Sequence, residues 1–306
     1  MTTTPGERTP TGADRPIVSV VVPCLNEERN LPYVFGRMPA DIDEVIVVDG
    51  GSVDRTVERA YELWPSAKVV QQTRKGKGNA LVCGFEACTG DIIVMIDADG
   101  STDPAEIPDF VRALRAGADF AKGSRFLPGG GSHDITAIRK LGNSALSGTV
   151  NTLFKTRYSD LCYGYNAFWR WVVPYLDLPD VNAPAPAPGE MLWGDGFEIE
   201  TLINVRVAAL GLRVGEVASV EAARIHGVSN LSAVRDGSRV LRTIMAERRR
   251  ARAYRKSDRP TQKLPKAIAP RPVGAGSGIW SSFADDVRST PGPVGVPALL
   301  KPTEER

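Results

Sequence analysis

Short apolar runs alternate with helical segments along the first 126 residues of the chain. Runs rich in β-branched residues fill positions 17–22, 45–48, 68–71, 92–96 and 119–122. Between them, segments such as 56–63 and 80–87 carry apolar residues at helical spacing. Asp103 is the predicted N-cap of a further helix that opens with Pro104 and runs towards Leu114. This alternation predicts βα units and a mainly parallel sheet.

The pattern changes after residue 139. Residues 141–154 predict a long helix, and an aromatic-rich stretch occupies 163–171. A helix over 197–210, a strand over 213–220 and a last helix over 231–254 complete the predicted fold. Prolines in 177–189 remove backbone donors, so this stretch predicts an exposed loop, a candidate lid. We interpret the second half as an elaboration of the same sheet that shapes a second pocket.

The two ends of the chain have the composition of disordered segments. Residues 1–15 are polar and lack the apolar core of a signal peptide. Pro, Gly, Ser and charged residues dominate 257–306. We therefore expect a disordered segment 1–15, one folded domain 16–256 and a disordered tail 257–306. The folded domain divides into a first half, 16–126, and a second half, 127–256.

Composition excludes several function classes. The chain has 306 residues, is 42% hydrophobic and carries a formal charge of +2, which suits a globular protein and does not call for nucleic acid. Its 4 cysteines lack metal-ligand spacing, which indicates reduced thiols and a cytoplasmic protein. No apolar stretch reaches the roughly 18 residues that span a bilayer, so we expect a protein that is not secreted and has no transmembrane helix.

Two carboxylates follow the fourth apolar run. Asp97 and Asp99 are two positions apart in an extended segment, so their side chains point the same way. Hard divalent cations prefer oxygen ligands, and ligands collect beyond the carboxyl ends of strands in open α/β sheets. The pair predicts a Mg²⁺ or Mn²⁺ site. A turn or a helix cap is the open alternative for an Asp after a strand.

Other strand ends carry groups that suit a nucleotide. Asp49 can accept a hydrogen bond from a nucleobase N–H, and Gly51 lets the backbone approach a flat ligand. Alternatively, Ser52 or Asp54 caps the helix that follows. The basic loop 74–80 combines cations with free backbone N–H groups at a helix start, which favours a diphosphate. A solvated basic turn is its alternative, and the P-loop pattern is absent from the sequence.

Five motifs together resemble the family 2 glycosyltransferases, the nucleotide-sugar enzymes of the GT-A fold. They are VPCLNEE at 22–28, DGGSVDRT at 49–56, GKGNA at 76–80, DADG at 97–100 and GSRF at 123–126. The resemblance covers residues 17–242 and is strongest to enzymes of the dolichyl or polyprenyl phosphate mannosyltransferase type. It implies an α/β fold of the GT-A class: a Rossmann-like, mainly parallel sheet flanked by helices, with an acceptor-side elaboration in the second half.

The resemblance also implies a donor site. Pro23, Asn26 and Glu27 would line the nucleoside pocket, and Asp49 would read the base. The full expected donor-binding set is Pro23, Asn26, Glu27, Asp49, Gly51, Ser52, Lys75, Lys77, Gly78, Asp97 and Ala98. The expected metal ligands are Asp97, Asp99 and His226, the last within a segment that resembles an Arg-x-x-Gly-x-Ser element. The chain departs from the family at Gly50 and at Gly100-Ser101, where relatives carry an acid and a ligand-supplying Gln.

The expected reaction is an inverting transfer of a sugar to a polyprenyl phosphate, a saccharide or a small molecule. A hydroxyl acceptor needs a base, for which Asp195 and Glu198 are the candidates, and an N-cap is the alternative for Asp195. A phosphate acceptor is already ionised and needs no strong base. Arg125, Asp160 and Asn166 are the expected acceptor-side residues.

The last predicted helix is basic and amphipathic. It carries eight arginines between positions 235 and 255, and it suits either a peripheral contact with an anionic membrane or a solvated cover of the core. Three other function classes stay open. They are a retaining glycosyltransferase of the phosphoglycerate type, a sugar-phosphate nucleotidyltransferase, whose glycine-rich loop after the first strand this chain lacks, and a non-catalytic protein that binds nucleotide sugars.

Overall fold

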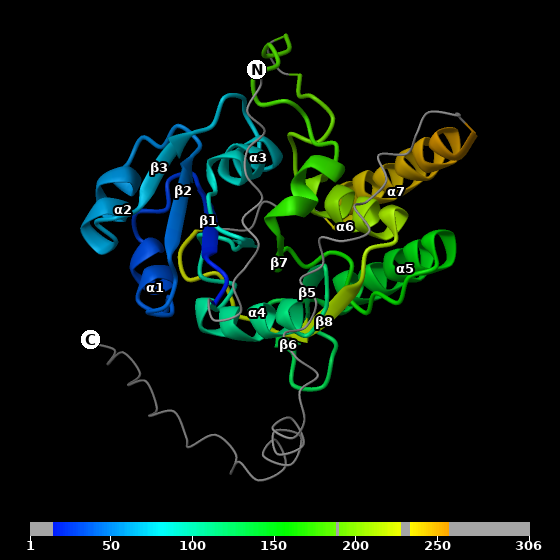
Figure 1. The fold of residues 1–306 in the computed structure, drawn as a ribbon, viewed down its shortest axis with the longest axis horizontal. Helices are drawn as coiled ribbons and strands as arrows, with labels where there is room; N and C mark the ends of the chain where they lie inside the picture. Colours follow the sequence, from blue (N-terminus) through cyan, green and yellow to red (C-terminus); the bar gives the residue numbers. More distant parts are fainter. Residues whose placement is uncertain (1–14, 188–189, 228–232, 257–306) are drawn as a thin grey trace, which may run out of the picture. The chain divides into compact units, whose positions relative to one another are not determined.

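The computed structural model describes residues 15–187, 190–227 and 233–256. All of them belong to one compact unit, Met1–Arg271. Almost all of the predicted N-terminal segment and the whole of the predicted tail lie outside the described residues. The described part contains nearly all of the predicted domain 16–256 (Figure 1).

A seven-stranded sheet forms the centre of this unit. Its order is β3 (Lys68–Gln71), β2 (Glu44–Asp49), β1 (Val18–Cys24), β4 (Ile92–Met95), β7 (Asn166–Trp169), β5 (Phe120–Ser124) and β8 (Val214–Ala218). Neighbouring strands are parallel, except that β7 runs antiparallel to both β4 and β5. The predicted α/β class with a mainly parallel sheet is confirmed. Two short strands, β6 (Gly131–Ser132) and β9 (Val220–Glu221), pair separately.

Helices cover both faces of the sheet. On one face lie α1 (Leu31–Phe35), α2 (Thr56–Leu63) and α4 (Ile107–Arg115), and on the other lie α3 (Lys77–Ala87) and α6 (Ile199–Leu210). Helices α5 (Ala137–Phe154) and α7 (Ala233–Lys256) lie side by side and pack against α6 (Figure 1). Because the sheet is buried on both faces, its central strands β1 and β4 are mostly apolar, which explains the continuous runs in the sequence.

Most predicted elements lie where the sequence places them. Helix α2 and strand β3 have the predicted bounds. Asp103 caps the 3₁₀ turn Pro104–Glu106, which leads into α4, by accepting a hydrogen bond from the Ala105 N–H at 3.0 Å. Helix α3 starts three residues earlier than predicted. The aromatic-rich stretch contributes β7 and the 3₁₀ helix Arg170–Tyr175.

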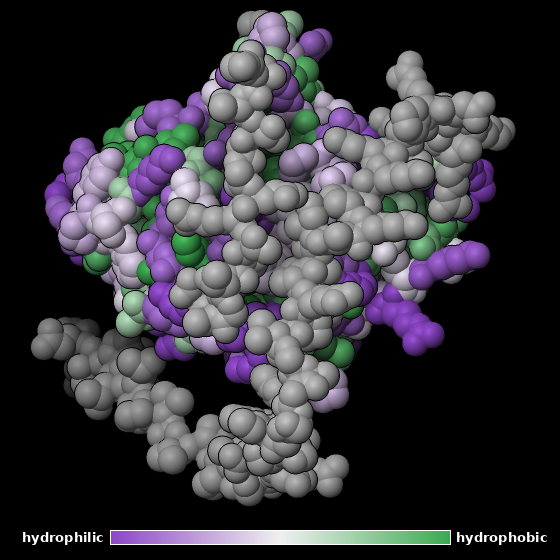
Figure 2. Space-filling view, viewed as in Figure 1, coloured by the Kyte–Doolittle hydropathy of each residue, from purple (hydrophilic) through white to green (hydrophobic). Residues whose placement is uncertain are grey.

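The loop predicted over 177–189 contains neither helix nor strand in its described residues. The apolar side chains gather in the layers next to the sheet. The face drawn in Figure 2, by contrast, mixes hydrophilic and hydrophobic residues.

Helix α3 can lie close to the sheet because Gly84 has no side chain. A Cβ there would lie 2.3 Å from Val21 Cγ1 and 3.0 Å from Val48 Cγ2. We expect Gly84→Ala to lower the free energy of unfolding by about 1–3 kcal/mol through overpacking, measured by urea denaturation. Gly142 in α5 is the control, because a Cβ at that position would meet no neighbouring group within 4 Å. Gly142→Ala should be neutral or stabilising by up to about 1 kcal/mol, and equal losses in both variants would contradict this packing.

Candidate functional site

Parallel pairing brings the ends of four strands to one edge of the sheet. Cys24 pairs with Asp49, Asp49 pairs with Gln71, and Val21 pairs with Met95. The polar residues that follow β1, β2, β3 and β4 therefore share this edge. The expectation that the strand ends meet is confirmed.

The loops after β1 and β2 interlock. Asn26 adopts a left-handed conformation with φ 58°, and its Oδ1 accepts a hydrogen bond from the Val53 N–H at 2.9 Å. Its own N–H donates to the Ser52 Oγ at 2.9 Å. Gly51 also has a positive φ, 86°, which favours glycine there. Asn26 and Ser52 thus hold the two loops together, next to Pro23 within β1.

Asp49 is almost fully buried, at 3% exposure, and its carboxylate is well supplied with donors. It accepts hydrogen bonds from the N–H groups of Gly51 and Ser52, each at 3.1 Å, and from Gln71 Nε2 at 3.0 Å. Burial raises the pKa of Asp49, but the bonds from Ser52 and Gln71 outweigh it and lower the pKa below its ordinary value. The group stays an ionised acceptor, as base recognition requires.

The basic loop after β3 is fixed by the second half of the chain. The Arg74 guanidinium binds both carboxylate oxygens of Asp195, at 2.7 and 2.9 Å, and donates to the carbonyl groups of residues 180, 181 and 183. The N–H groups of Gly78 and Asn79 donate to the Asp195 carbonyl at 2.7 and 3.2 Å.

The prediction that these N–H groups stay free for a diphosphate is therefore wrong. Gly78 instead lets the chain approach closely, because a Cβ there would lie 1.9 Å from the Gly194 carbonyl oxygen. Lys75 is exposed beside this contact.

Lys77 lies between two carboxylates from different halves of the chain. Its Nζ is 2.6 Å from Asp97 Oδ1 and 2.6 Å from Glu200 Oε1. Burial lowers the pKa of Lys77, but the two carboxylates outweigh it and raise the pKa above its ordinary value. Burial, followed by the charges of Glu200 and Asp99, raises the pKa of Asp97 although Lys77 opposes them. One ammonium thus pairs with two carboxylates at this edge.

Asp99 has a cationic partner of its own. Its Oδ2 lies 2.7 Å from an Arg224 nitrogen, and its Oδ1 accepts from the Ser101 N–H at 2.9 Å. Arg224 also lies 3.7 Å from Glu27, whose pKa is raised by burial. Ala98, between the two aspartates, is buried.

A polar cavity of about 300 Å³ lies beside these residues. Its lining includes Asn26, Glu27, Asp54, Arg224 and His226.

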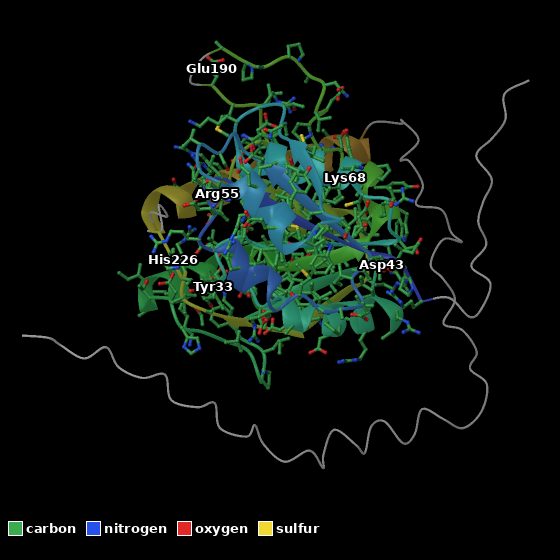
Figure 3. All side chains as sticks on the ribbon, turned by 90° about the vertical axis from the view of Figure 1, so that its left-hand side faces the viewer. Tyr33, Asp43, Arg55, Lys68, Glu190 and His226 are labelled. Carbon is green, nitrogen blue, oxygen red and sulfur yellow. The ribbon has the colours of Figure 1, made fainter. Side chains whose placement is uncertain are left out.

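The predicted metal ligands do not form a ready-made cluster. Among the described residues, no three His, Cys, Asp or Glu side chains are placed to hold a metal ion. The His226 ring instead packs edge-on against Tyr33, with 5.8 Å between ring centres. The two residues are labelled close to each other in Figure 3. Asp97 and Asp99 nevertheless fit Mg²⁺ or Mn²⁺, since carboxylate oxygens are the ligands that these hard cations prefer. They would supply part of a ligand set that diphosphate oxygens complete.

The two candidate bases are engaged in structural contacts. The Asp195 side chain is 1% exposed and paired with Arg74. Glu198 is buried and accepts from the N–H groups of Gly194 and Gly196, at 2.9 and 3.3 Å. Neither side chain reaches Asp97 or Lys77 through a described contact. The alternative that Asp195 caps α6 is also wrong, because the helix starts at Ile199 and its cap position is Glu198.

The three predicted acceptor residues lie in the interior. Arg125 pairs with Asp160 at 2.7 Å and with Glu221 at 3.0 Å, and Asp160 is fully buried. Asn166 lies in the middle of the sheet and donates to the Gly164 carbonyl at 3.2 Å. The ion pairs of Arg125 with Asp160 and Glu221 connect the end of β5 with the segment before β7 and with β9. In this structure they do not form an open acceptor surface, because buried charges need fixed partners.

Two residues outside the predicted set contact the candidate site: Glu200 pairs with Lys77, and Arg224 pairs with Asp99. Glu200 lies two positions after the candidate base Glu198 and faces another direction, towards Lys77. Because residues two apart on a helix point to nearly opposite sides, a buried Glu198 already implies a Glu200 directed elsewhere.

Comparison with known proteins identifies the family. Residues 19–170 match the family model described as glycosyl transferase family 2. The chain is 39% identical over 132 residues to the dolichol-phosphate mannosyltransferase of Pyrococcus furiosus, an alignment that covers 40% of this chain and 37% of that enzyme. It is 34% identical over 227 residues to the polyprenol monophosphomannose synthase of Mycolicibacterium smegmatis, covering 70% and 80% of the two chains.

A solved structure confirms the GT-A fold. Glucosyl-3-phosphoglycerate synthase from Mycobacterium tuberculosis, in complex with Mn²⁺, UDP-glucose and phosphoglyceric acid, superposes with a TM-score of 0.57. The two sequences are 25% identical, and the match covers 76% of this chain and 80% of the synthase.

The buried pair of Arg74 and Asp195 predicts a stability role for Asp195. We expect Asp195→Asn to lower the free energy of unfolding by about 3 kcal/mol, because it leaves the Arg74 charge buried without its partner. Urea denaturation measures the loss. Asp109→Asn is the control, since its side chain is 49% exposed, and it should change stability by less than about 0.5 kcal/mol. If the Asp195→Asn protein is as stable as the parent but inactive, the stability role is wrong and the prediction that Asp195 is the catalytic base is supported.

Proposed function

This chain belongs to glycosyl transferase family 2, and on that premise we propose that it transfers a hexosyl group from a nucleoside-diphosphate sugar to a polyprenyl phosphate. The enzyme is a hexosyltransferase that uses a nucleotide sugar. The identity of the acceptor is the step we add. It rests on two relatives whose names specify dolichol phosphate and polyprenol as the acceptors of mannose, and on the state of the carboxylates around the site.

The donor would bind along the edge formed by β1 to β4. Asn26 and Glu27 line its nucleoside end, and Asp49 supplies an ionised acceptor for a base N–H. Lys77 is placed to neutralise the diphosphate, because its ammonium has three donors and the two carboxylates use two of them. Asp97 and Asp99 would hold Mg²⁺ or Mn²⁺, which supplies positive charge to the departing diphosphate when bound. His226 would need to turn away from Tyr33 to take part.

One observation favours a phosphate acceptor. Among the described residues at this edge, the candidate carboxylates already have partners: Asp195 has Arg74, Glu198 has backbone N–H groups, and Glu200 has Lys77. A hydroxyl acceptor needs a carboxylate that is free to take its proton. A phosphate oxygen is ionised near neutral pH and needs no base. It can form the bond to the anomeric carbon directly as the bond to the diphosphate breaks, with inversion.

A retaining transfer to a phosphoglycerate-type acceptor is the second candidate. The solved synthase with Mn²⁺, UDP-glucose and phosphoglyceric acid, whose fold matches over most of this chain, favours it. Both candidates use an acceptor that carries phosphate. The anomeric configuration of the product, measured by NMR, separates inversion from retention.

Asp99 provides the test of the metal role. We expect Asp99→Ala to reduce transfer from UDP- or GDP-hexose with Mn²⁺ by roughly a hundredfold, because the charge on the leaving diphosphate is less well compensated. Asp43→Asn is the control, because Asp43 pairs with Arg15 instead. If Asp99→Ala is as active as the parent, the metal role is wrong. Tight donor binding without turnover on any acceptor would instead support a non-catalytic protein.

A lipid acceptor also predicts contact with a membrane surface. Helix α7 exposes Leu241 and Met245, at 44% and 43%, beside the exposed Arg242, Arg249 and Arg252. Within the described ranges, no helix has the length and apolar character needed to cross a membrane. We therefore propose that α7 binds anionic lipid peripherally, through charge and a small apolar area.

Flotation with vesicles tests this contact. The protein should float with anionic vesicles at low salt, and a variant with Arg242→Glu and Arg249→Glu should stay in the soluble fraction. Arg112→Glu on α4 is the matched control, since this exposed arginine lies on another helix, and it should float like the parent. A parent protein that stays soluble with anionic vesicles would contradict the proposal.

A further inference from the structure

We propose that Glu200 is a positioning residue for the donor: it keeps the Lys77 ammonium in place so that Asp97 can exchange Lys77 for a metal ion. The inference rests on the proposed function, because it assumes that a nucleoside diphosphate and a divalent cation bind at this edge. It assigns a role to a residue that the sequence analysis passed over.

The contacts show one ammonium shared equally. Lys77 Nζ lies 2.6 Å from Asp97 Oδ1 and 2.6 Å from Glu200 Oε1. The Lys77 and Glu200 side chains are each 17% exposed, and that of Asp97 is 33% exposed. Asp97 is therefore the more accessible of the two carboxylates. A cation arriving from solvent meets Asp97 first and leaves the pair of Lys77 and Glu200 intact.

Glu200 is well placed to stay where it is. It lies in the first turn of α6, whose Ile199 and Leu202 are buried in the core beside the sheet. Its carboxylate fits against the backbone at Gly164, where a Cβ would lie 2.3 Å from Oε1. The helix and the close approach of Gly164 thus fix the carboxylate that holds Lys77.

The charges explain why this fixed partner matters. When Asp97 binds a cation, Lys77 loses one carboxylate but keeps the other, so it remains charged and directed at the diphosphate. Without the Glu200 charge, Asp97 would be the only carboxylate in contact with Lys77 among the described residues, and a metal ion would have to break that pair. Removing Glu200 therefore strengthens the competition between Lys77 and the metal. It also makes the edge less negative, which favours an anion that binds without metal.

The test is the effect of Mn²⁺ on the affinity for UDP and GDP, measured by isothermal titration calorimetry with and without the metal. For Glu200→Gln, we expect the factor by which Mn²⁺ tightens nucleotide binding to fall by about tenfold. Affinity without Mn²⁺ should be unchanged or higher. In a Lys77→Met background, Glu200→Gln should not change the factor, because the residue acts through Lys77.

Two further variants separate the position of the Glu200 carboxylate from its charge and provide a control. Gly164→Ala displaces the Glu200 carboxylate without altering any charge, and it should also lower the Mn²⁺ factor. Glu58→Gln is the matched control, because Glu58 is exposed on α2, and it should behave like the parent. Parallel losses of affinity with and without Mn²⁺ would overturn the inference in favour of a purely structural role, and so would an unchanged factor. If the parent binds neither nucleotide, the proposed function fails, and the inference fails with it.

Discussion

One ammonium group, that of Lys77, joins the two halves of this enzyme at its donor edge. Asp97 comes from the end of β4 and Glu200 from the first turn of α6, 103 positions further along the chain (200 − 97). Both carboxylates are partly buried. Like charges repel more strongly in such a low-dielectric setting than in water, so an ammonium between them is correspondingly effective. This shared charge links the end of β4 to α6, and it forms the immediate surroundings of the aspartate that we propose to hold a metal ion.

A second contact reinforces the same junction a few residues away. Arg74 donates hydrogen bonds to the Asp195 carboxylate and to the carbonyl groups of residues 180, 181 and 183. The Asp195 carbonyl accepts hydrogen bonds from the N–H groups of Gly78 and Asn79, near the start of α3. Arg74 and the N–H groups of Gly78 and Asn79 are therefore engaged in fixing the second half of the chain. In the proposed function, a diphosphate at this edge would be neutralised by the Lys77 side chain and a metal ion, because the N–H groups of Gly78 and Asn79 are already engaged.

The sequence predicted those features that depend on neighbours along the chain. The β-branched runs predicted the strands because a sheet buried on both faces needs them, and parallel strands then bring Asp49 and Asp97 to one edge. What could not be predicted were pairings between distant residues. Nothing local shows that Arg74 binds Asp195, that Arg125 buries Asp160, or that β7 enters the sheet antiparallel. The sequence pointed to Glu198, whereas the direction of the side chains at the start of α6 brings Glu200 to Lys77.

The most direct test of this account is a crystal structure of the enzyme with Mn²⁺ and the nucleoside diphosphate that binds it best. The account predicts Lys77 Nζ within hydrogen-bonding distance of both Glu200 and a diphosphate oxygen, with Asp97 and Asp99 on the metal ion. A structure in which Lys77 remains on Asp97, or abandons Glu200 for the diphosphate, would contradict it.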